Sequence, residues 1–123
     1  MTIKFFFLDE QKNLLNFYNG IDLLLLTSHS ESFPNVVAES MLCCTPVLSS
    51  DAGCAKYIIN NNKFIFLKND YKTIFKDLKK IINLIIDQKF EWKTIKKNSR
   101  TQIQNNFSIS NMANSYLQKW VFK

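Results

Sequence analysis

Glycine and proline are scarce in this sequence, with two residues of each among 123, and histidine occurs once. No internal repeat, low-complexity linker or domain boundary is visible. The longest apolar run, residues 23–26 with its flanks, is far below the roughly 20 residues that span a bilayer. These absences argue against several domains and against a membrane-spanning chain. They leave one domain, residues 1–123, that is large enough to bury a core.

Cysteine is too sparse to build a disulfide framework. Cys43, Cys44 and Cys54 are odd in number and show no C-x-x-C spacing, so neither disulfides nor a zinc site is expected. This usage favours a reduced, cytoplasmic setting. Residues 1–10 hold too short an apolar run for a signal peptide. We therefore expect a cytoplasmic protein, with peripheral contact at the inner face of a membrane as the alternative.

Charge is divided unevenly along the chain. Residues 1–62 contain three basic and six acidic residues, a net charge of −3, whereas residues 63–123 contain thirteen basic and four acidic residues, a net charge of +9. A basic half favours anionic partners such as nucleic acid, anionic lipid or phosphorylated substrates. The lysines fall at amphipathic spacings, however, so solvated helix faces are the simpler interpretation. No nucleic-acid partner is expected.

What is present is a regular alternation of short apolar runs and helix-like segments, in a chain that is 46% hydrophobic. Strands are expected at residues 3–8, 21–28, 46–50 and 63–68. Helices are expected at residues 9–18, 34–43, 51–59, 70–87, 90–105 and 110–122. Start signals for these helices are Asp9, Pro34, Asp70, Ser108 and Ser110. The run at 21–28 suits a strand that is buried on both faces.

This alternation predicts an α/β fold, a Rossmann-like parallel sheet flanked by helices. Ligands in such open sheets bind at the carboxyl ends of the strands. The segment 29–33 follows the strand expected at 21–28, so it lies where a site is expected.

Two glutamates, Glu31 and Glu39, follow that strand with seven residues between them. If a helix begins at Pro34, Glu31 lies in the loop before it and Glu39 lies in its second turn. The free N–H groups of a helix start bind phosphate well. Ionised carboxylates only accept hydrogen bonds, so they suit sugar hydroxyls. Together these groups fit a nucleotide sugar.

The stretch from Ser28 to Val47, SHSESFPNVVAESMLCCTPV, and the following Asp51-Ala52-Gly53-Cys54 resemble the donor-binding segment of the family 4 glycosyltransferases. This is the retaining group with the GT-B fold, whose pattern is S-x-x-E-G-F-P-N-v-v-x-E-A-M-A-C-G-x-P-V and then D-x-G-G. The later NNFSISNMANSYLQ is similar to the family's F-S…Y ending. The resemblance implies part of the second of two domains, ending in helices at about 90–122.

By this resemblance, the chain binds a nucleotide-sugar donor. Glu31 would be the catalytic-centre carboxylate that contacts the donor sugar. The diphosphate and sugar would meet the backbone of Ser32, Phe33, Pro34, Asn35 and Val36. Glu39 would hold the ribose hydroxyls. The family usually transfers sugar to a glycan or lipid acceptor without a metal, so no metal or other cofactor is expected.

The sequence departs from the family in its glycines and its extent. Ser32, Cys44 and Cys54 stand where the family has glycine, and Tyr57 stands where it often has glutamate. Cys44 ends the motif helix, where a left-handed residue is usual. The acceptor domain and the segment that carries the family's Arg/Lys pair have no counterpart. We therefore expect no sugar transfer by this chain alone, and a separate chain that supplies the rest.

Alternatives remain open at this point. The chain could be a non-catalytic remnant or a regulatory partner subunit with the same fold. The two glutamates could be ordinary loop and helix acids, and the only histidine, His29, falls at a variable motif position. The 70–87 helix could lie on a membrane surface, although its apolar stripe more simply packs on the sheet.

Overall fold

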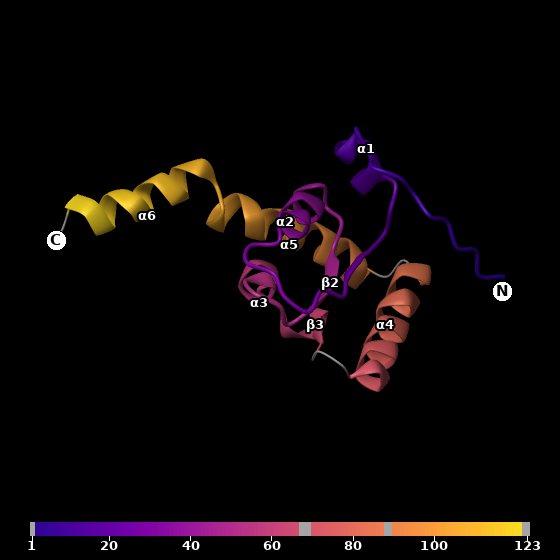
Figure 1. Ribbon diagram of the computed structural model, residues 1–123. Helices are drawn as coiled ribbons and strands as arrows, with labels where there is room; N and C mark the ends of the chain where they lie inside the picture. The colour runs from indigo at the N-terminus through magenta and orange to yellow at the C-terminus, as the bar shows by residue number, and fades with distance from the viewer. Residues whose placement is uncertain (1, 67–69, 88–89, 122–123) are drawn as a thin grey trace.

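Three parallel strands form the centre of the computed structural model, which describes residues 2–66, 70–87 and 90–121 (Figure 1). The strands are β1 (Leu24–Leu26), β2 (Val47–Ser50) and β3 (Ile65–Phe66). Their order is β1-β2-β3, with Leu25 opposite Leu48 and Ser49 opposite Ile65. β2 is the central strand and all its residues are buried. The predicted α/β architecture with a parallel sheet is confirmed.

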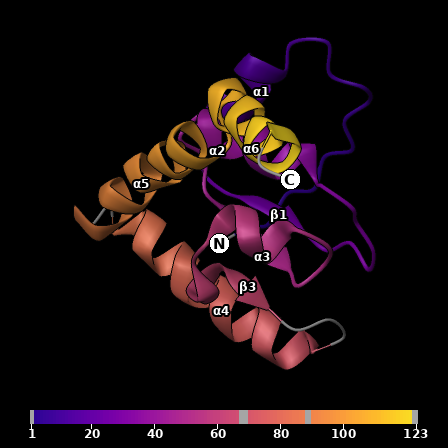
Figure 2. The ribbon, with the colours of Figure 1, turned by 90° about the vertical axis from the view of Figure 1, so that its left-hand side faces the viewer.

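Helices make the connections and flank the sheet. They are α1 (Leu14–Asn19), α2 (Asn35–Leu42), α3 (Ala55–Ile59), α4 (Tyr71–Ile86), α5 (Phe90–Asn106) and α6 (Ile109–Val121), with a 3-10 turn, η1, at Asn62–Phe64. α2 joins β1 to β2, and α3 with η1 joins β2 to β3, the crossovers that parallel strands require. α5 packs against α2 and α3, whereas α4 lies beside β3 and α5 (Figure 2).

The core lies where the central strand meets these helices. Leu48 of β2, Val37 and Met41 of α2, Ile58 of α3 and Ile103 of α5 are buried in one apolar cluster. Val37, Leu48 and Ile58 have no exposed surface at all. The motif helix α2 is therefore held on the sheet from one side and by α5 from the other.

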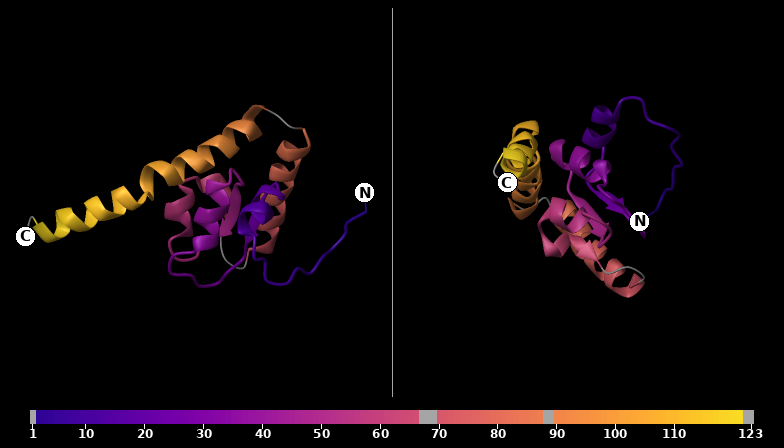
Figure 3. Two further views of the ribbon diagram at one scale, coloured as in Figure 1. Left: turned by 90° about the horizontal axis from the view of Figure 1, so that it is seen from above. Right: turned by 60° about the vertical axis from the view of Figure 1, so that its left-hand side comes forward.

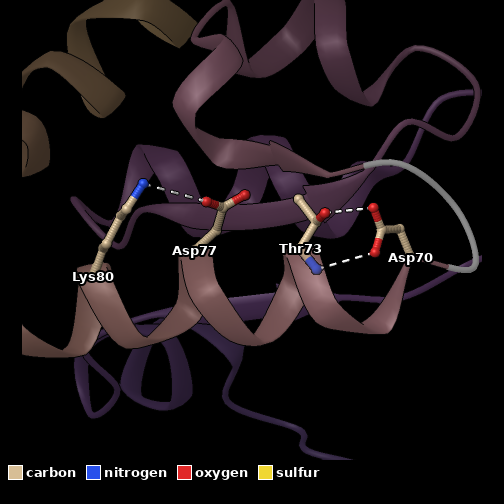
Figure 4. Close-up of polar contacts among 4 residues, drawn as sticks. All are labelled: Asp70, Thr73, Asp77 and Lys80. Atoms are coloured by element: carbon tan, nitrogen blue, oxygen red, sulfur yellow. Dashed lines mark hydrogen bonds and ion pairs between the residues drawn. The ribbon is translucent and has the colours of Figure 1, made fainter.

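α4 begins as predicted, with Asp70 as its cap. The Asp70 carboxylate accepts hydrogen bonds from the Thr73 hydroxyl and from the Thr73 N–H, the latter at 3.1 Å (Figure 4). These bonds from Thr73 lower the pKa of Asp70, because they stabilise its ionised form. One turn on, Lys80 and Asp77 form an ion pair at 3.9 Å. The four lysines of α4 are all exposed, as expected for a solvated helix face.

The predicted strand at 3–8 is wrong. These residues form no strand, and the side chains of Phe5 and Phe7 are 84% and 102% exposed. A strand needs a neighbour to satisfy its backbone groups, and this segment has none among the described residues. The following helix was predicted from Asp9, but it begins at Leu14, where the Asn13 side chain accepts a hydrogen bond from the Asn16 N–H.

β1 is shorter and more exposed than the run at 21–28 predicted. It covers three residues, and Leu25 is 40% exposed, so the strand is not buried on both faces. Within the described part of the chain, β1 pairs only with β2, which makes it an edge strand. The apolar run correctly indicated a parallel strand, but it could not distinguish an edge strand from a central one. The strand expected at 63–68 is seen at 65–66, and its last two residues lie outside the described ranges.

α6 continues from α5 and extends away from the rest of the molecule, opposite the N-terminal segment (Figures 1 and 3). The Ser108 hydroxyl accepts a hydrogen bond from the Asn111 N–H, so Ser108 caps this helix. Ser110, the other expected cap, lies inside it. The apolar side chains of α6 recur every three or four residues and are exposed; they are Ile109, Met112, Tyr116, Leu117 and Trp120.

Candidate functional site

The Glu31 carboxylate is held at the carboxyl ends of two neighbouring strands. The Ser28 hydroxyl, just after β1, donates a hydrogen bond to Glu31 Oε1 at 2.8 Å. Ser50, the last residue of β2, donates its hydroxyl hydrogen to the Ser28 carbonyl at 2.6 Å. Glu31 is partly buried, so its side chain is oriented while part of it still faces solvent. This is the edge of the sheet where the sequence analysis expected a site.

Gly53 fixes the backbone of the same loop. Its φ is +54°, and a Cβ at this position would lie 1.9 Å from the Glu31 carbonyl oxygen. The next residue, Cys54, donates its N–H to the Ser32 carbonyl at 3.1 Å. The turn after β2 therefore lies directly against the Glu31–Ser32 backbone. The motif predicted a glycine turn here, but not that this turn supports the first glutamate.

The start of α2 offers unused backbone donors beside this loop. Pro34 was expected as the first helical residue, but it is extended (φ −74°, ψ 94°) and is the cap that precedes Asn35. Its carbonyl accepts the Val37 N–H at 3.0 Å, and no side chain caps the helix. The N–H groups of Asn35 and Val36 have no helical acceptor, as at any helix start. An anion that approaches the exposed Asn35 and Val36 would meet these donors.

Glu39 lies further along α2, where it contacts α1. The Tyr18 hydroxyl donates a hydrogen bond to Glu39 Oε2 at 3.0 Å. Tyr18 is only 4% exposed. Burial, and then the hydrogen bond and negative charge of Glu39, raise the pKa of Tyr18 to about 12. Tyr18 is the residue of this site that sequence reasoning missed, because no local pattern shows that its hydroxyl meets a carboxylate from another helix.

Phe33 packs its side chain against Phe107. Its ring centroid lies 6.0 Å from that of Phe107, and Phe107 meets Tyr57 edge-on at 5.4 Å. These rings line a hollow of about 470 Å³ that α6 also borders through Tyr116 and Lys119.

The structure thus brings the predicted residues together in part. Glu31 and Ser32 lie in the loop next to the start of α2, and Glu39 lies along the same helix, half-buried against α1. Cys44 has a φ of +58°, which confirms the left-handed residue expected at the end of the motif helix. His29 is exposed.

Two further kinds of feature are absent from the described residues. In the described ranges no three residues among His, Cys, Asp and Glu gather where they could hold a metal ion. Likewise, none of the helices of the described residues is long and apolar enough to cross a membrane.

Comparison with known proteins decides the family. Residues 2–102 match the model of the family described as glycosyl transferases group 1. The chain belongs to this family. The match includes all three strands and the whole segment from Glu31 to Gly53, so the family assignment made from that segment is confirmed.

Two curated relatives of this group 1 chain illustrate its extent. The capsular polysaccharide biosynthesis glycosyltransferase CapM of Staphylococcus aureus is 29% identical over 114 residues, which cover 85% of this chain and 29% of that protein. An uncharacterized 41.2 kDa protein in the cps region of Klebsiella pneumoniae is 28% identical over 110 residues, 89% of this chain and 29% of that protein. The chain therefore spans less than a third of the length of these relatives. No solved structure gives a significant match.

Proposed function

We propose that this chain contributes the donor half-site of a retaining glycosyltransferase that uses a nucleotide sugar. The observation that carries the proposal is the oriented Glu31 carboxylate beside the uncapped start of α2, with Glu39 on the same helix. Carboxylates suit hydroxyl donors, and free N–H groups suit phosphates. Membership of the group 1 family supports the same ligand.

The proposed roles follow the order of the groups along the chain. Glu31 accepts hydrogen bonds from the donor sugar at the reaction centre. The diphosphate lies against the N–H groups of Asn35 and Val36, with the backbone of Ser32, Phe33 and Pro34 lining the approach. Glu39 accepts hydrogen bonds from the ribose hydroxyls. The ligand then runs along the first turns of α2.

The proposed reaction is the transfer of a hexose to a hydroxyl of a glycan or lipid acceptor. The bond from the anomeric carbon to the β-phosphate oxygen breaks, and the nucleoside diphosphate leaves with that electron pair. A bond from the same carbon to the acceptor oxygen forms with retention, and the acceptor proton is released. Backbone donors at the phosphate stabilise the charge that develops on the leaving group, so no metal is required in this scheme.

We further propose that transfer requires a second polypeptide, equivalent to the upstream part of the relatives, that completes the sheet. In the doubly wound order 3-2-1-4-5-6, the third and fourth strands are consecutive in the chain, but strands 2 and 1 lie between them in the sheet. Residues 3–8 and β1 stand at the positions of the third and fourth strands of that order, so we propose that two strands of the upstream part lie between them in the assembled sheet. These strands would pair with the segment 3–8 and with the open edge of β1.

The open edge gives a direct test of this partner. The Leu24 N–H donates to the carbonyl of Pro46, the residue before β2. Because backbone groups alternate in direction along a strand, those of Leu25 point to the open edge. Mixing the chain with the upstream region of CapM is expected to yield a complex by size-exclusion chromatography. Leu25→Pro, which removes the outward N–H, should weaken it, whereas Leu25→Thr, which keeps the N–H, should not. No complex, or equal binding by Leu25→Pro, would contradict the proposal.

Titration calorimetry with UDP, GDP and their sugars tests the donor site itself. We expect binding that Glu39→Gln and Glu31→Gln weaken about tenfold or more, the effect of losing a hydrogen bond to a charged group. Glu10→Gln, in the exposed N-terminal segment, is the matched control and should bind as the wild type does. A chain that binds no nucleotide or sugar nucleotide, even with the upstream region present, would refute the donor site.

The alternative is a non-catalytic partner subunit that keeps the fold. The observation in its favour is the replacement of family glycines by Ser32, Cys44 and Cys54, of which Cys44 occupies a left-handed conformation. A reconstituted pair separates the two functions. Labelled sugar transferred to an acceptor supports the enzyme, whereas donor binding without transfer supports the regulatory subunit.

The location of the protein is a further part of the proposal. Nucleotide sugars are the expected donor, and the name of CapM refers to capsular polysaccharide biosynthesis. We place the chain on this basis in the cytoplasm, in polysaccharide biosynthesis, with contact to the inner face of a membrane through its acceptor.

A further inference from the structure

Tyr18 joins α1 to the proposed ribose-binding carboxylate through a chain of hydrogen bonds. The Tyr18 hydroxyl donates to Glu39 Oε2 at 3.0 Å. The Thr45 hydroxyl donates to the Tyr18 carbonyl at 2.7 Å, and the Ser40 hydroxyl donates to the Thr45 carbonyl at 2.9 Å. Tyr18, Ser40 and Thr45 are all buried. The network therefore ties α1, α2 and the turn before β2 into one unit.

This arrangement gives the Glu39 carboxylate a partner within the protein. The Tyr18 hydroxyl donates to Oε2, and Glu39 is only partly buried, so part of the residue remains accessible to a ligand. A free glutamate side chain loses rotamer entropy when a ligand orders it. The hydrogen bond from Tyr18 already orders the Glu39 side chain in the folded protein, so ligand binding has to restrict that side chain less.

We propose that Tyr18 is a positioning residue that orients Glu39 for the ribose hydroxyls and so determines how strongly the site prefers a ribonucleotide. The inference rests on the proposed donor site. It goes beyond that site because Tyr18 lies outside the Glu31–Gly53 segment and comes from a separate helix.

A purely structural role for Tyr18 makes a different prediction. A buried hydroxyl needs some partner, and the Tyr18 ring also packs edge-on against Phe17 at 5.5 Å. If that packing were the whole role, Tyr18→Phe would lower stability and leave nucleotide selectivity unchanged. A positioning role instead couples Tyr18 to groups of the ligand that it does not touch.

The test compares UDP and GDP with their 2′-deoxy forms by titration calorimetry. For the nucleotide that the wild type binds, we expect Tyr18→Phe to weaken binding of the ribose form by about tenfold and of the deoxy form much less. The ratio of the two affinities should therefore fall. Tyr71→Phe, on the exposed start of α4, should keep the wild-type ratio. A wild-type ratio in Tyr18→Phe would overturn the inference.

A double-mutant cycle keeps the test decisive if Tyr18→Phe is destabilised. Because Tyr18 acts through Glu39, Tyr18→Phe should cost ribonucleotide affinity in the wild type but none in a Glu39→Ala background, which removes the acceptor of the Tyr18 hydroxyl. Equal, additive losses in both backgrounds would also overturn it. A wild type that binds no ribonucleotide, with the upstream region present, would instead refute the donor site on which this inference rests.

Discussion

Apolar side chains are buried in the segment from α2 to α3 but exposed at the two ends of the chain. In that segment, Val37 of α2, Leu48 of β2 and Ile58 of α3 are completely buried. At the ends, Phe7 is 102% exposed and Trp120 of α6 is 82% exposed. Both ends extend away from the sheet (Figure 3). The difference teaches that apolar periodicity specifies a surface to be covered, whereas burial depends on whether a partner element is present.

Among the substitutions considered, Gly53→Ala is expected to lower the stability of the protein most. The new Cβ would meet the Glu31 carbonyl oxygen at 1.9 Å, and φ is +54° there, so either the turn or the Glu31 loop has to move. We expect a loss of about 3 kcal/mol or more in the free energy of unfolding. Urea denaturation followed by circular dichroism measures it.

The other glycine provides the control for that substitution. Gly20 has an ordinary φ of −87°, and a Cβ would lie 3.2 Å from the Asn16 carbonyl oxygen. Gly20→Ala should therefore change stability by no more than about 1 kcal/mol. Equal effects of the two substitutions would contradict the proposed support of the Glu31 loop by the turn after β2.

The elements from β2 to the start of α4 were predictable from sequence because their signals are local. The strand at 46–50, the turn at Gly53 and the cap at Asp70 follow from residues within a few positions, and the structure contains all three. The failures required long-range information. The segment 3–8 has strand composition but no neighbour, and nothing in the run at 21–28 marks it as an edge strand.

The candidate site was predictable to the same degree. Glu31 and Glu39 were found by their spacing and by the motif around them. The partner of Glu39 is 21 positions away, and a tyrosine in an amphipathic helix looks the same whether its hydroxyl meets water or a carboxylate. Contacts of this kind depend on how α1 packs against α2, which no local pattern encodes.

Two leucine truncations should sharpen the contrast between the regions. Leu48→Ala in β2 empties part of a fully buried site and is expected to cost about 2–5 kcal/mol. Leu117→Ala on α6 removes the same atoms from a side chain that is 57% exposed, so we expect a change within about 0.5 kcal/mol. Denaturant midpoints of the isolated chain give both values. A comparable loss from Leu117→Ala would mean that α6 is covered in solution.

High pH should lower the stability of the folded protein through ionisation of Tyr18. Its pKa is about 12 in the folded protein, above the ordinary value of 10.0, so the folded state favours the neutral hydroxyl. The resulting stabilisation is complete below pH 10 and is lost as pH rises towards 12. Stability measured against pH should fall over this window in the wild type and less in Tyr18→Phe. Identical profiles would show that Tyr18 ionises as it does in the unfolded chain.

Cys44→Gly should give the smallest effect, and in the opposite direction. Cys44 has a φ of +58°, a conformation that costs a residue with a Cβ roughly 1–2 kcal/mol, and glycine avoids most of that cost. Glycine also gains freedom in the unfolded chain, which offsets about half of the benefit. We therefore expect stabilisation of about 0.5 kcal/mol, measured by thermal unfolding. Its neighbour Cys43 has a φ of −82°, where a Cβ causes no strain. Cys43→Gly therefore increases the freedom of the unfolded chain without relieving strain in the folded one, and it should destabilise the protein. If both substitutions destabilise it, the left-handed position is not under strain, and the missing glycine no longer favours the non-catalytic alternative.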